Sequence, residues 1–295
     1  MQKTRKYAEK EKFDGGASVM NKAYSVLMSV YQRERPEFLR AAITSILNQT
    51  LQAKEIILVC DGPLTEELEQ VLEEFSSYLT LIRLKENGGL GKALAEGLKH
   101  CQCEWVVRMD SDDLAVSDRC EKQMAYVQQH PETDVLSGTV AEFTGDALTP
   151  EGAAQQVCSH RRVPETNQEI GKYITYRNPM NHPCVMLRRT KALEAENYQP
   201  CSLFEDYDLW VRMFQNQCVF ANLGSTLLFM RVNEMHKRRG GMAYARAIRH
   251  FWKKMYQRGM ISLPQYLIRT TARVAVSLCP NQIRKIIYDR KLRDR

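Results

Sequence analysis

The sequence lacks the features that mark several common classes of protein. No apolar run approaches the roughly 18 residues that a membrane-spanning helix needs, and no signal-peptide pattern precedes the first predicted strand. The nine cysteines form no CxxC pair, and the closest two, Cys101 and Cys103, lack partners at zinc-ligand spacing. These absences argue against a membrane span, a structural zinc and a disulfide framework, and they predict reduced thiols in a cytosol.

Acidic residues are missing from one long stretch. From Met235 to Tyr288 there are twelve Lys or Arg and no Asp or Glu, although the net charge of the 295-residue chain is only +7. The composition is otherwise that of a globular protein, with 44% apolar and 26% charged residues. A chain of this length can form one large domain with an appendage.

Two familiar phosphate-binding motifs are absent as well. A P-loop ending at Lys92 requires glycine where the chain has Glu86 and Ser or Thr where it has Ala93. A dinucleotide fingerprint starting at Gly89 fails because its third glycine position is Leu94. What remains is a glycine-rich helix start whose backbone amides can approach a ligand, with Lys92 either a nearby cation or a solvated helix residue.

What the chain does contain is an alternation of strands and helices. Apolar runs predict buried strands at 24–30, 55–60, 79–84, from 105 onward and at 134–140. Helical spacing predicts helices at 36–47, 65–77, 90–100 and 117–130. Short connections between such elements predict an α/β fold with a mostly parallel sheet covered by helices on both faces.

Three carboxylates follow the strand that begins at Trp105. Asp110, Asp112 and Asp113 stand within four residues. Carboxylates so close repel one another unless they share a cation, and hard oxygen ligands suit Mg²⁺ or Mn²⁺. A single Asp would more simply cap the next helix, whereas three indicate a metal site.

Polar loops follow four of the predicted strands. In open parallel sheets, ligands bind outside the carboxyl ends of the strands, so these loops should line one rim. The loops are 32–35, 61–62, 87–91 and 110–113.

The second half of the chain contains one irregular stretch and two groups of candidate polar residues. Gly145 to Val163 lacks a period and predicts a long surface loop, and His182 lies in a turn before a strand at 184–187, where it is either catalytic or structural. Glu205 and Asp206 precede an apolar helix face, where acidic residues also offset the helix dipole.

Five segments resemble the family 2 glycosyltransferases with a GT-A fold, in the subgroup typified by amylovoran and other exopolysaccharide or capsule enzymes. The resemblance runs in order from Tyr24 to Gly241 and covers most of the chain. It departs at Cys60, where the family usually has the first Asp of a pair, and at 94–95, where many relatives carry Arg-Asn. The segments are 25–31, 47–50, 55–62, 87–89 and 109–113.

The resemblance implies a metal-dependent inverting transfer from a nucleotide-sugar, UDP-linked, to a saccharide or polyprenyl-diphosphate-linked acceptor. It implies Asp206 as the catalytic base, assisted by Glu205, Asp208 or His182. The metal, Mn²⁺ or Mg²⁺, would be held by Asp110, Asp112 and His236. The nucleotide-sugar contacts implied are Tyr31, Glu34, Asp61, Asn87, Gly89, Lys92, Asp110, Ser111 and Asp112, and the diphosphate contacts are Arg231, Arg238 and Arg239.

Composition and the resemblance together predict that the chain has three parts. Residues 1–22 are expected to be a mobile tail, 23–241 the GT-A domain, and 242–295 a basic, amphipathic helical region. Within the domain, the nucleotide-sugar half is about 23–140 and the acceptor half about 141–241.

The basic C-terminal region has two interpretations. Apolar residues interleaved with Lys and Arg can lie on an anionic membrane, or the stripe can pack on the domain. No nucleic-acid recognition motif is present. We expect a cytoplasmic protein bound peripherally to the inner face of the cell membrane.

Two other functions remain open at this point. A nucleotidyltransferase shares the strand-end carboxylates and the metal, but it needs no acidic pair some 90 residues downstream. The departures at Cys60 and at 94–95 also leave room for a catalytically silent, membrane-associated binding subunit.

Overall fold

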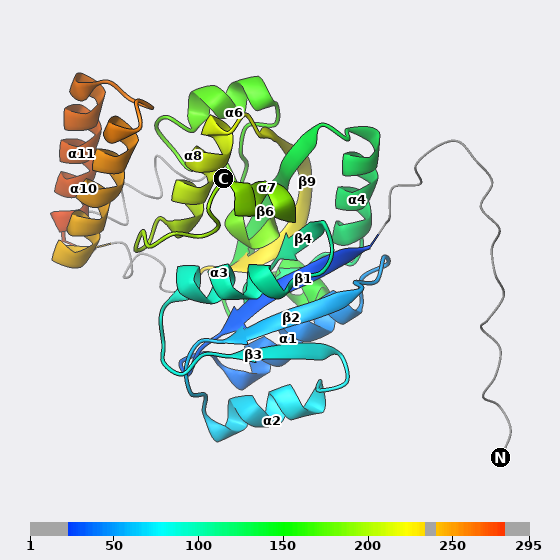
Figure 1. The fold of residues 1–295 in the computed structure, drawn as a ribbon. Helices are drawn as coiled ribbons and strands as arrows, with labels where there is room; N and C mark the ends of the chain where they lie inside the picture. The colour runs from blue at the N-terminus through cyan, green and yellow to red at the C-terminus, as the bar shows by residue number, and fades with distance from the viewer. Residues whose placement is uncertain (1–22, 234–239, 281–295) are drawn as a thin grey trace, which may run out of the picture.

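A nine-stranded mixed sheet forms the centre of the molecule, with helices on both faces and a helical hairpin at one side (Figure 1). The computed structural model describes residues 23–233 and 240–280. The strand order is β3-β2-β1-β4-β8-β6-β9-β5, and β7 pairs with β6.

The first half confirms the predicted alternation of strands and helices. Its helices begin where the sequence signals a start, as at Thr65, whose hydroxyl accepts a hydrogen bond from the backbone N–H of Leu68. The elements are β1 (Tyr24–Val30), α1 (Pro36–Leu47), β2 (Glu55–Cys60), α2 (Glu66–Glu74), β3 (Leu79–Arg83), α3 (Leu90–His100), β4 (Trp105–Arg108), β5 (Leu114–Ala115) and α4 (Arg119–Gln129).

The strands β3, β2, β1 and β4 are parallel, and their register aligns their carboxyl ends. Val30 pairs with Cys60, and Cys60 pairs with Arg83. The loops that follow these strands therefore leave the sheet at the same edge, as the sequence predicted.

The second half of the sheet is mixed. The strand β8 is antiparallel to both β4 and β6, β9 is parallel to β6, and β5 and β7 are antiparallel to their neighbours. The elements are β6 (Thr133–Phe143), α5 (Pro150–Ala154), β7 (Val157–Arg161), α6 (Asn167–Tyr173), η1 (His182–Cys184), β8 (Met186–Arg188), α7 (Arg189–Glu194), α8 (Glu205–Gln215) and β9 (Val219–Arg231).

The predicted surface loop from Gly145 to Val163 is wrong in part, because it contains α5 and β7. The helix has only five residues, too few to show a period, and the Thr149 hydroxyl caps it by accepting from the Gly152 amide at 3.1 Å. The strand is stabilised by pairing with β6 rather than by an apolar pattern of its own. The next predicted strand also begins later than expected, at Met186.

Two apolar layers cover the two faces of the sheet. On β4, Val107 packs with residues of α1 and α4, whereas Val106 packs with residues of α3 and α8. Successive side chains of a strand point to opposite faces, so Arg108 points toward the layer that contains α3 and α8. Its charge acts on the carboxyls of Glu205 and Asp206 at the amino end of α8.

The C-terminal region folds as a hairpin of α10 (Gly241–Gln257) and α11 (Leu263–Leu278). The apolar stripe of α10 packs on the domain: Phe251 and Trp252 are buried, and the Phe251 ring lies 4.5 Å from that of Tyr207 on α8. The packing interpretation is therefore right for α10. In contrast, Leu267 and Ile268 on the outer face of α11 are 53% and 70% exposed.

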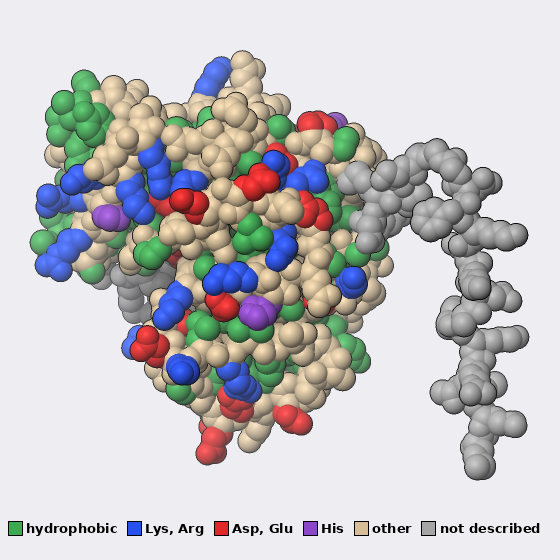
Figure 2. Space-filling view, viewed as in Figure 1, with side chains coloured by type: hydrophobic (Ala, Val, Ile, Leu, Met, Phe, Trp, Pro, Cys, Tyr) green, Lys and Arg blue, Asp and Glu red, His purple; other side chains and the backbone are tan. Residues whose placement is uncertain are grey.

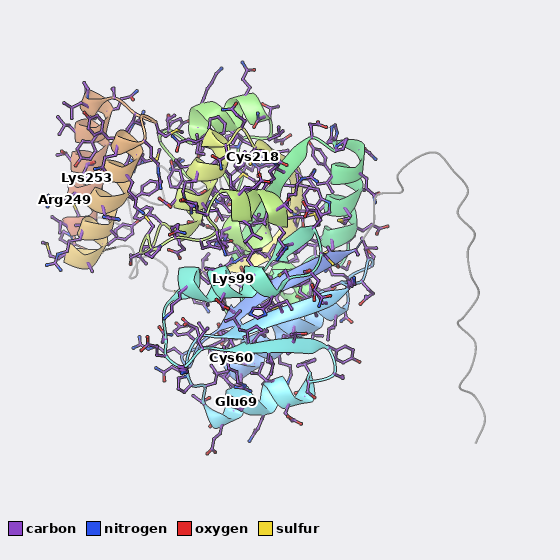
Figure 3. All side chains as sticks on the ribbon, viewed as in Figure 1. Cys60, Glu69, Lys99, Cys218, Arg249 and Lys253 are labelled. Atoms are coloured by element: carbon purple, nitrogen blue, oxygen red, sulfur yellow. The ribbon has the colours of Figure 1, made fainter. Side chains whose placement is uncertain are left out.

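The hairpin is also basic on its outside. Lys and Arg side chains gather over it in the space-filling view (Figure 2), and Arg249 and Lys253 are exposed on α10 (Figure 3). Among the described residues, no helix combines the length and hydropathy that crossing a membrane requires.

Candidate active site

Three carboxylates gather directly after β4. Asp110, Asp112 and Asp113 each offer one carboxylate oxygen, and these oxygens lie within 4.8 Å of one another. Asp113 is buried; its Oδ1 accepts from the backbone N–H of Arg231 at 2.8 Å, and its Oδ2 has no partner among the described residues. Burial and the charges of Asp112 and Asp110 raise the pKa of Asp113 well above its ordinary value. A buried carboxylate oxygen that has no hydrogen-bond partner and lies beside two other carboxylates fits a site for a divalent cation.

Arg108 is a site residue that the sequence analysis missed. It is the last residue of β4, its side chain is 2% exposed, and its guanidinium pairs with the Asp110 carboxylate. Its Nε has no partner within the described part of the chain. The available signal was an arginine in an otherwise apolar strand directly before an acidic cluster, because a buried cation is costly unless it is paired.

Arg231 fastens the carboxylate loop from the other side. Its Nε donates to the backbone carbonyl of Asp112 at 3.0 Å, and its Nη atoms donate to the carbonyls of Gly145 and Ala147. The guanidinium also stacks 3.7 Å from the ring centroid of Phe38. In this structure the guanidinium nitrogen atoms donate hydrogen bonds to backbone carbonyls. The expected contact of Arg231 with a diphosphate stays a prediction.

Asp61 joins the loops after β2 and β3. Its carboxylate accepts from the backbone N–H groups of Gly88 and Gly89 at 2.7 and 2.9 Å, and Asn87 Nδ2 donates to its backbone carbonyl at 3.1 Å. The chain passes Asn87 so closely at Gly62 that a Cβ there would lie 2.7 Å from the Asn87 amide nitrogen. Asp61, Asn87 and Gly89 thus meet at the rim, as predicted, and their contacts with a nucleotide-sugar stay a prediction.

Glu34 and Ser111 connect the loops after β1 and β4. The Ser111 hydroxyl donates to Glu34 Oε2 at 2.5 Å, and the Glu34 amide donates to the carbonyl of Tyr31 at 3.0 Å. Tyr31 itself is half-buried directly after β1. Four loops predicted to share a rim are therefore held together in pairs.

Lys92 and Cys60 lie at the margin of this group. Lys92 is exposed in the first turn of α3 and pairs with Glu86 at 3.6 Å, which matches the solvated alternative. Cys60 is a core residue next to α2 (Figure 3), and burial raises the pKa of its thiol to about 11. The side chain at the position of the family's first Asp therefore packs into the interior.

A second acidic pair begins α8, as predicted. Asp206 Oδ1 accepts from the Tyr207 amide at 2.7 Å, and its Oδ2 accepts from Asn178 Nδ2 at 2.6 Å. Burial raises the pKa of Asp206. Burial and the charge of Asp206 raise the pKa of Glu205 to about 7, and Arg108 and Asp110 also act on that carboxyl. The structure therefore brings the acidic pair into electrostatic contact with the carboxylate cluster.

His182 and Asp208 have structural partners. His182 is buried with its Nε2 2.9 Å from the Tyr198 hydroxyl, and burial and the charge of Arg108 lower its pKa well below the ordinary value. This is the satisfied histidine that the sequence left open, and a catalytic part for it stays a prediction. Asp208 is buried and pairs with Arg258, the residue directly after α10, at 2.6 Å, and an orienting part for it stays a prediction.

Three predicted site residues lie outside the described part of the chain, and the structure does not place them. They are His236, Arg238 and Arg239.

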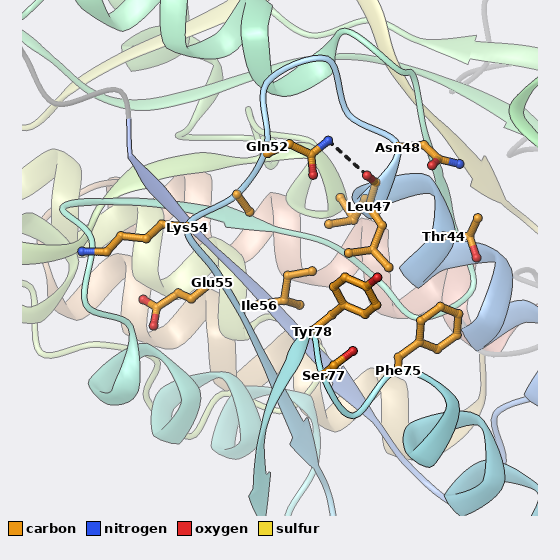
Figure 4. A pocket seen from close by; sticks show the side chains of 12 residues that line it. Thr44, Leu47, Asn48, Gln52, Lys54, Glu55, Ile56, Phe75, Ser77 and Tyr78 are labelled. Atoms are coloured by element: carbon orange, nitrogen blue, oxygen red, sulfur yellow. Dashed lines mark hydrogen bonds between the residues drawn. The ribbon is translucent and has the colours of Figure 1, made fainter. Parts of the chain in front are cut away.

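A pocket of about 520 Å³ lies away from these carboxylates, at the amino end of β2 (Figure 4). It is bordered by Gln52, whose amide donates to the Leu47 carbonyl at 3.1 Å, and by Glu55, whose carboxylate already accepts from the Ser25 hydroxyl and the Gln102 amide. We assign it no part in the chemistry, because it opens at the opposite edge of the sheet from the acidic residues.

Comparison with known proteins identifies related sequences. A model of the family described as glycosyl transferase family 2 matches residues 25–196. The amylovoran biosynthesis glycosyltransferase AmsE of Erwinia amylovora is 35% identical over 90% of this chain and 98% of its own length. A UDP-Gal:alpha-D-GlcNAc-diphosphoundecaprenol beta-1,3-galactosyltransferase of Escherichia coli is 34% identical over 92% of this chain and 96% of its own.

Solved structures share the fold. The 1–349 fragment of S. aureus TarS in complex with UDP-GlcNAc superposes with a TM-score of 0.61 at 19% identity, covering 79% of this chain and 66% of that fragment. The mannosyltransferase PcManGT of Pyrobaculum calidifontis, in complex with GDP-Man and Mn²⁺, superposes with a TM-score of 0.59 at 14% identity, covering 90% and 79%. These similarities establish the GT-A fold for the present chain.

Proposed function

The chain belongs to glycosyl transferase family 2, and on that premise we propose that it transfers a sugar from a UDP-sugar to a saccharide acceptor with inversion. The observation that carries the proposal is the arrangement of two acidic groups around one buried cation. Arg108 pairs with Asp110 of the carboxylate cluster and acts electrostatically on Glu205 and Asp206 at the start of α8.

The donor side would be the carboxylate cluster and its neighbouring loops. Asp110, Asp112 and Asp113 would hold Mn²⁺ or Mg²⁺, which fits the Asp113 Oδ2 atom, since that atom has no partner in the described ranges. A bound divalent cation supplies a Lewis acid for negative charge on a leaving diphosphate. The complexes of TarS with UDP-GlcNAc and of PcManGT with GDP-Man and Mn²⁺ support a nucleotide-sugar donor and a metal.

Asp206 would act as the base. The acceptor oxygen forms its bond to the anomeric carbon while the bond from that carbon to the diphosphate oxygen breaks, and the diphosphate leaves with the electron pair. Asp206 takes the hydroxyl proton. General-base help of this kind is worth about 10²–10⁴ in rate, and the raised pKa of Asp206 makes it a stronger base than an exposed aspartate.

The acceptor we propose is a saccharide linked through a diphosphate to a polyprenyl lipid, in the synthesis of a surface polysaccharide. AmsE is named for amylovoran biosynthesis, and the Escherichia coli relative is named for a GlcNAc-diphosphoundecaprenol acceptor. Such an acceptor lies in a membrane, and a membrane is a surface that the exposed apolar face of α11 could bind.

The nucleotide site is tested by calorimetric titration of UDP and GDP into the protein, with Mn²⁺ and with EDTA. We expect binding of UDP that requires Mn²⁺ and is lost in Asp112→Ala. The matched control is Glu74→Ala, which removes an exposed carboxylate from α2 and should leave UDP binding unchanged. Folded protein that binds neither nucleotide would refute the proposed donor site and favour a silent binding subunit.

The base is tested with Asp206→Asn, which keeps the shape and removes the proton acceptor. With UDP-hexoses as donors and a GlcNAc-diphosphate carrying an alkyl chain as acceptor, we expect kcat to fall about 10²–10⁴-fold, with UDP binding retained. An Asp206→Asn protein with unchanged kcat would show that another group takes the proton.

We further propose that α11 meets the membrane. Burying one large aliphatic side chain is worth about 1.5–3 kcal/mol, and each cation near an anionic surface adds about 1 kcal/mol. Leu267 and Ile268 are exposed, and the outer face of α10 carries Arg249 and Lys253. The double variant Leu267→Glu/Ile268→Glu should lose sedimentation with phosphatidylglycerol vesicles, whereas Tyr78→Glu, at an equally exposed position elsewhere, should not. Wild-type protein that stays in the supernatant would reject the surface.

A further inference from the structure

Three successive backbone carbonyls after α6 receive side-chain hydrogen bonds. The Tyr207 hydroxyl donates to the Ile174 carbonyl at 2.6 Å, Arg269 donates to the Thr175 carbonyl, and Arg273 donates to the Tyr176 carbonyl. These carbonyls lie in the turn that follows α6, and helices distant in sequence supply their donors. Two of the three donors come from α11, in the region that the sequence presented as an appendage.

Arg269 and Arg273 are held in place for this contact. They are four residues apart and therefore share one face of α11. Their guanidinium carbons lie 5.8 and 4.7 Å from the ring centroid of Trp252, which is buried in α10. Leu267 and Ile268 occupy the opposite, exposed face. The inner face of α11 is thus hydrogen-bonded to the loop after α6, while its outer face is solvent-exposed.

The loop bound by α11 contains Asn178, which is a hydrogen-bond partner of the proposed base Asp206. Asn178 lies two residues beyond Tyr176, and its Nδ2 donates to Asp206 Oδ2 at 2.6 Å. Its Oδ1 accepts from the Met180 amide at 3.2 Å, which fixes the orientation of the side-chain amide. The position of the Asp206 carboxylate therefore depends on a loop whose backbone is tied to α11.

We propose that α11 is a positioning element of the active site: Arg269 and Arg273 hold the loop after α6 so that Asn178 orients the carboxylate of Asp206. The inference rests on the proposed role of Asp206 as base. The arginines touch neither substrate nor the reacting atoms, and they act through Asn178. The C-terminal hairpin is on this view part of the catalytic scaffold as well as a candidate membrane surface.

The proposal has a consequence for the pH dependence of the reaction. Burial raises the pKa of Asp206, whereas the Tyr207 amide, the Asn178 amide and the charges of Arg161 and Arg108 lower it. The adjacent Glu205 carboxyl titrates near pH 7. Because the base must be ionised, loss of the Asn178 hydrogen bond should move the acidic limb of the kcat/KM profile to higher pH.

The experiment compares Arg269→Met/Arg273→Met with Asn178→Ala and with the triple variant, using the donor and acceptor assay described above. We expect the arginine pair and Asn178→Ala each to lower kcat about 10-fold, because part of the general-base contribution is lost, and to shift the acidic limb alike. The Kd for UDP with Mn²⁺ should stay within about twofold. The triple variant should be no slower than Asn178→Ala, since residues acting through one contact are not additive.

The control is Arg40→Met, which removes an arginine that also bridges two helices, through Glu74, but lies on α1. It should leave kcat unchanged. If the methionine variants do not fold, the double variant Arg269→Lys/Arg273→Lys carries the same test. Its kcat should fall by less than about 10-fold, because an ammonium group that can donate to the carbonyl remains at each position.

Three outcomes overturn the proposal. Folded arginine variants with wild-type kcat, beside an inactive Asp206→Asn protein, would overturn it alone. The same holds if the losses from the arginines and from Asn178 multiply in the triple variant. An active Asp206→Asn protein would overturn both the base and the inference that rests on it.

Discussion

Glu205 should make the stability of the metal-free protein fall as the pH rises through neutrality. Burial and the neighbouring Asp206 charge raise its pKa from 4.5 to about 7. Between these values the folded chain binds a proton that the unfolded chain has released, so stability falls with rising pH across this window and is level above it. One pKa unit corresponds to about 1.4 kcal/mol, which gives a loss of about 3 kcal/mol overall, most of it between pH 5 and pH 8.

The Glu205→Gln variant removes this titration while keeping the shape of the side chain. We expect urea unfolding in EDTA, followed by circular dichroism, to show the variant losing about 2–3 kcal/mol less stability than wild type between pH 5 and pH 8. The matched control is Glu66→Gln, because Glu66 is the first helical residue of α2 as Glu205 is of α8, but is exposed. Equal pH dependence in wild type and Glu205→Gln would refute the reasoning, since the folded protein would then carry no extra proton at this position.

Three further substitutions test the framework around the site. Arg108→Met should destabilise the protein by about 1.5–3 kcal/mol, because it removes a hydrogen bond to the charged Asp110 carboxylate, which is itself 34% exposed, and calorimetry should show weaker Mn²⁺ binding; unchanged unfolding would contradict this. Gly62→Ala should cost about 1–3 kcal/mol by thermal unfolding, since φ is +86° and the new Cβ would lie 2.7 Å from the Asn87 amide nitrogen; a neutral effect would show that the loop yields. Asp208→Asn should expose the hairpin to limited proteolysis, because the ion pairs of Asp208 with Lys254 of α10 and with Arg258 directly after it are lost; cleavage at the wild-type rate would argue that apolar packing alone holds α10.

The sequence by itself determined the half of the fold in which local pattern and topology agree. The strands before Asp61 and Asp110 are mostly apolar, and short connections force them into a parallel sheet whose carboxyl ends coincide. The positions of these two residues, and of Asp206 at a helix start, follow from the chain's own periodicity. The same reasoning could not find α5 and β7, because a five-residue helix and an edge strand have no periodic signal.

Only the tertiary structure decided how the acidic groups are joined. Arg108 and Asp110 are two residues apart, but Glu205 comes almost 100 residues later, and only the packing of α8 over the sheet brings it under the influence of both. In the same way Arg269 reaches a carbonyl 94 residues earlier in the chain. Such contacts depend on how whole elements pack, and periodicity within one element carries no information about its partner. The acidic residues that can perform the chemistry can therefore be identified from the sequence. The charge state and orientation of their carboxyl groups depend on the fold.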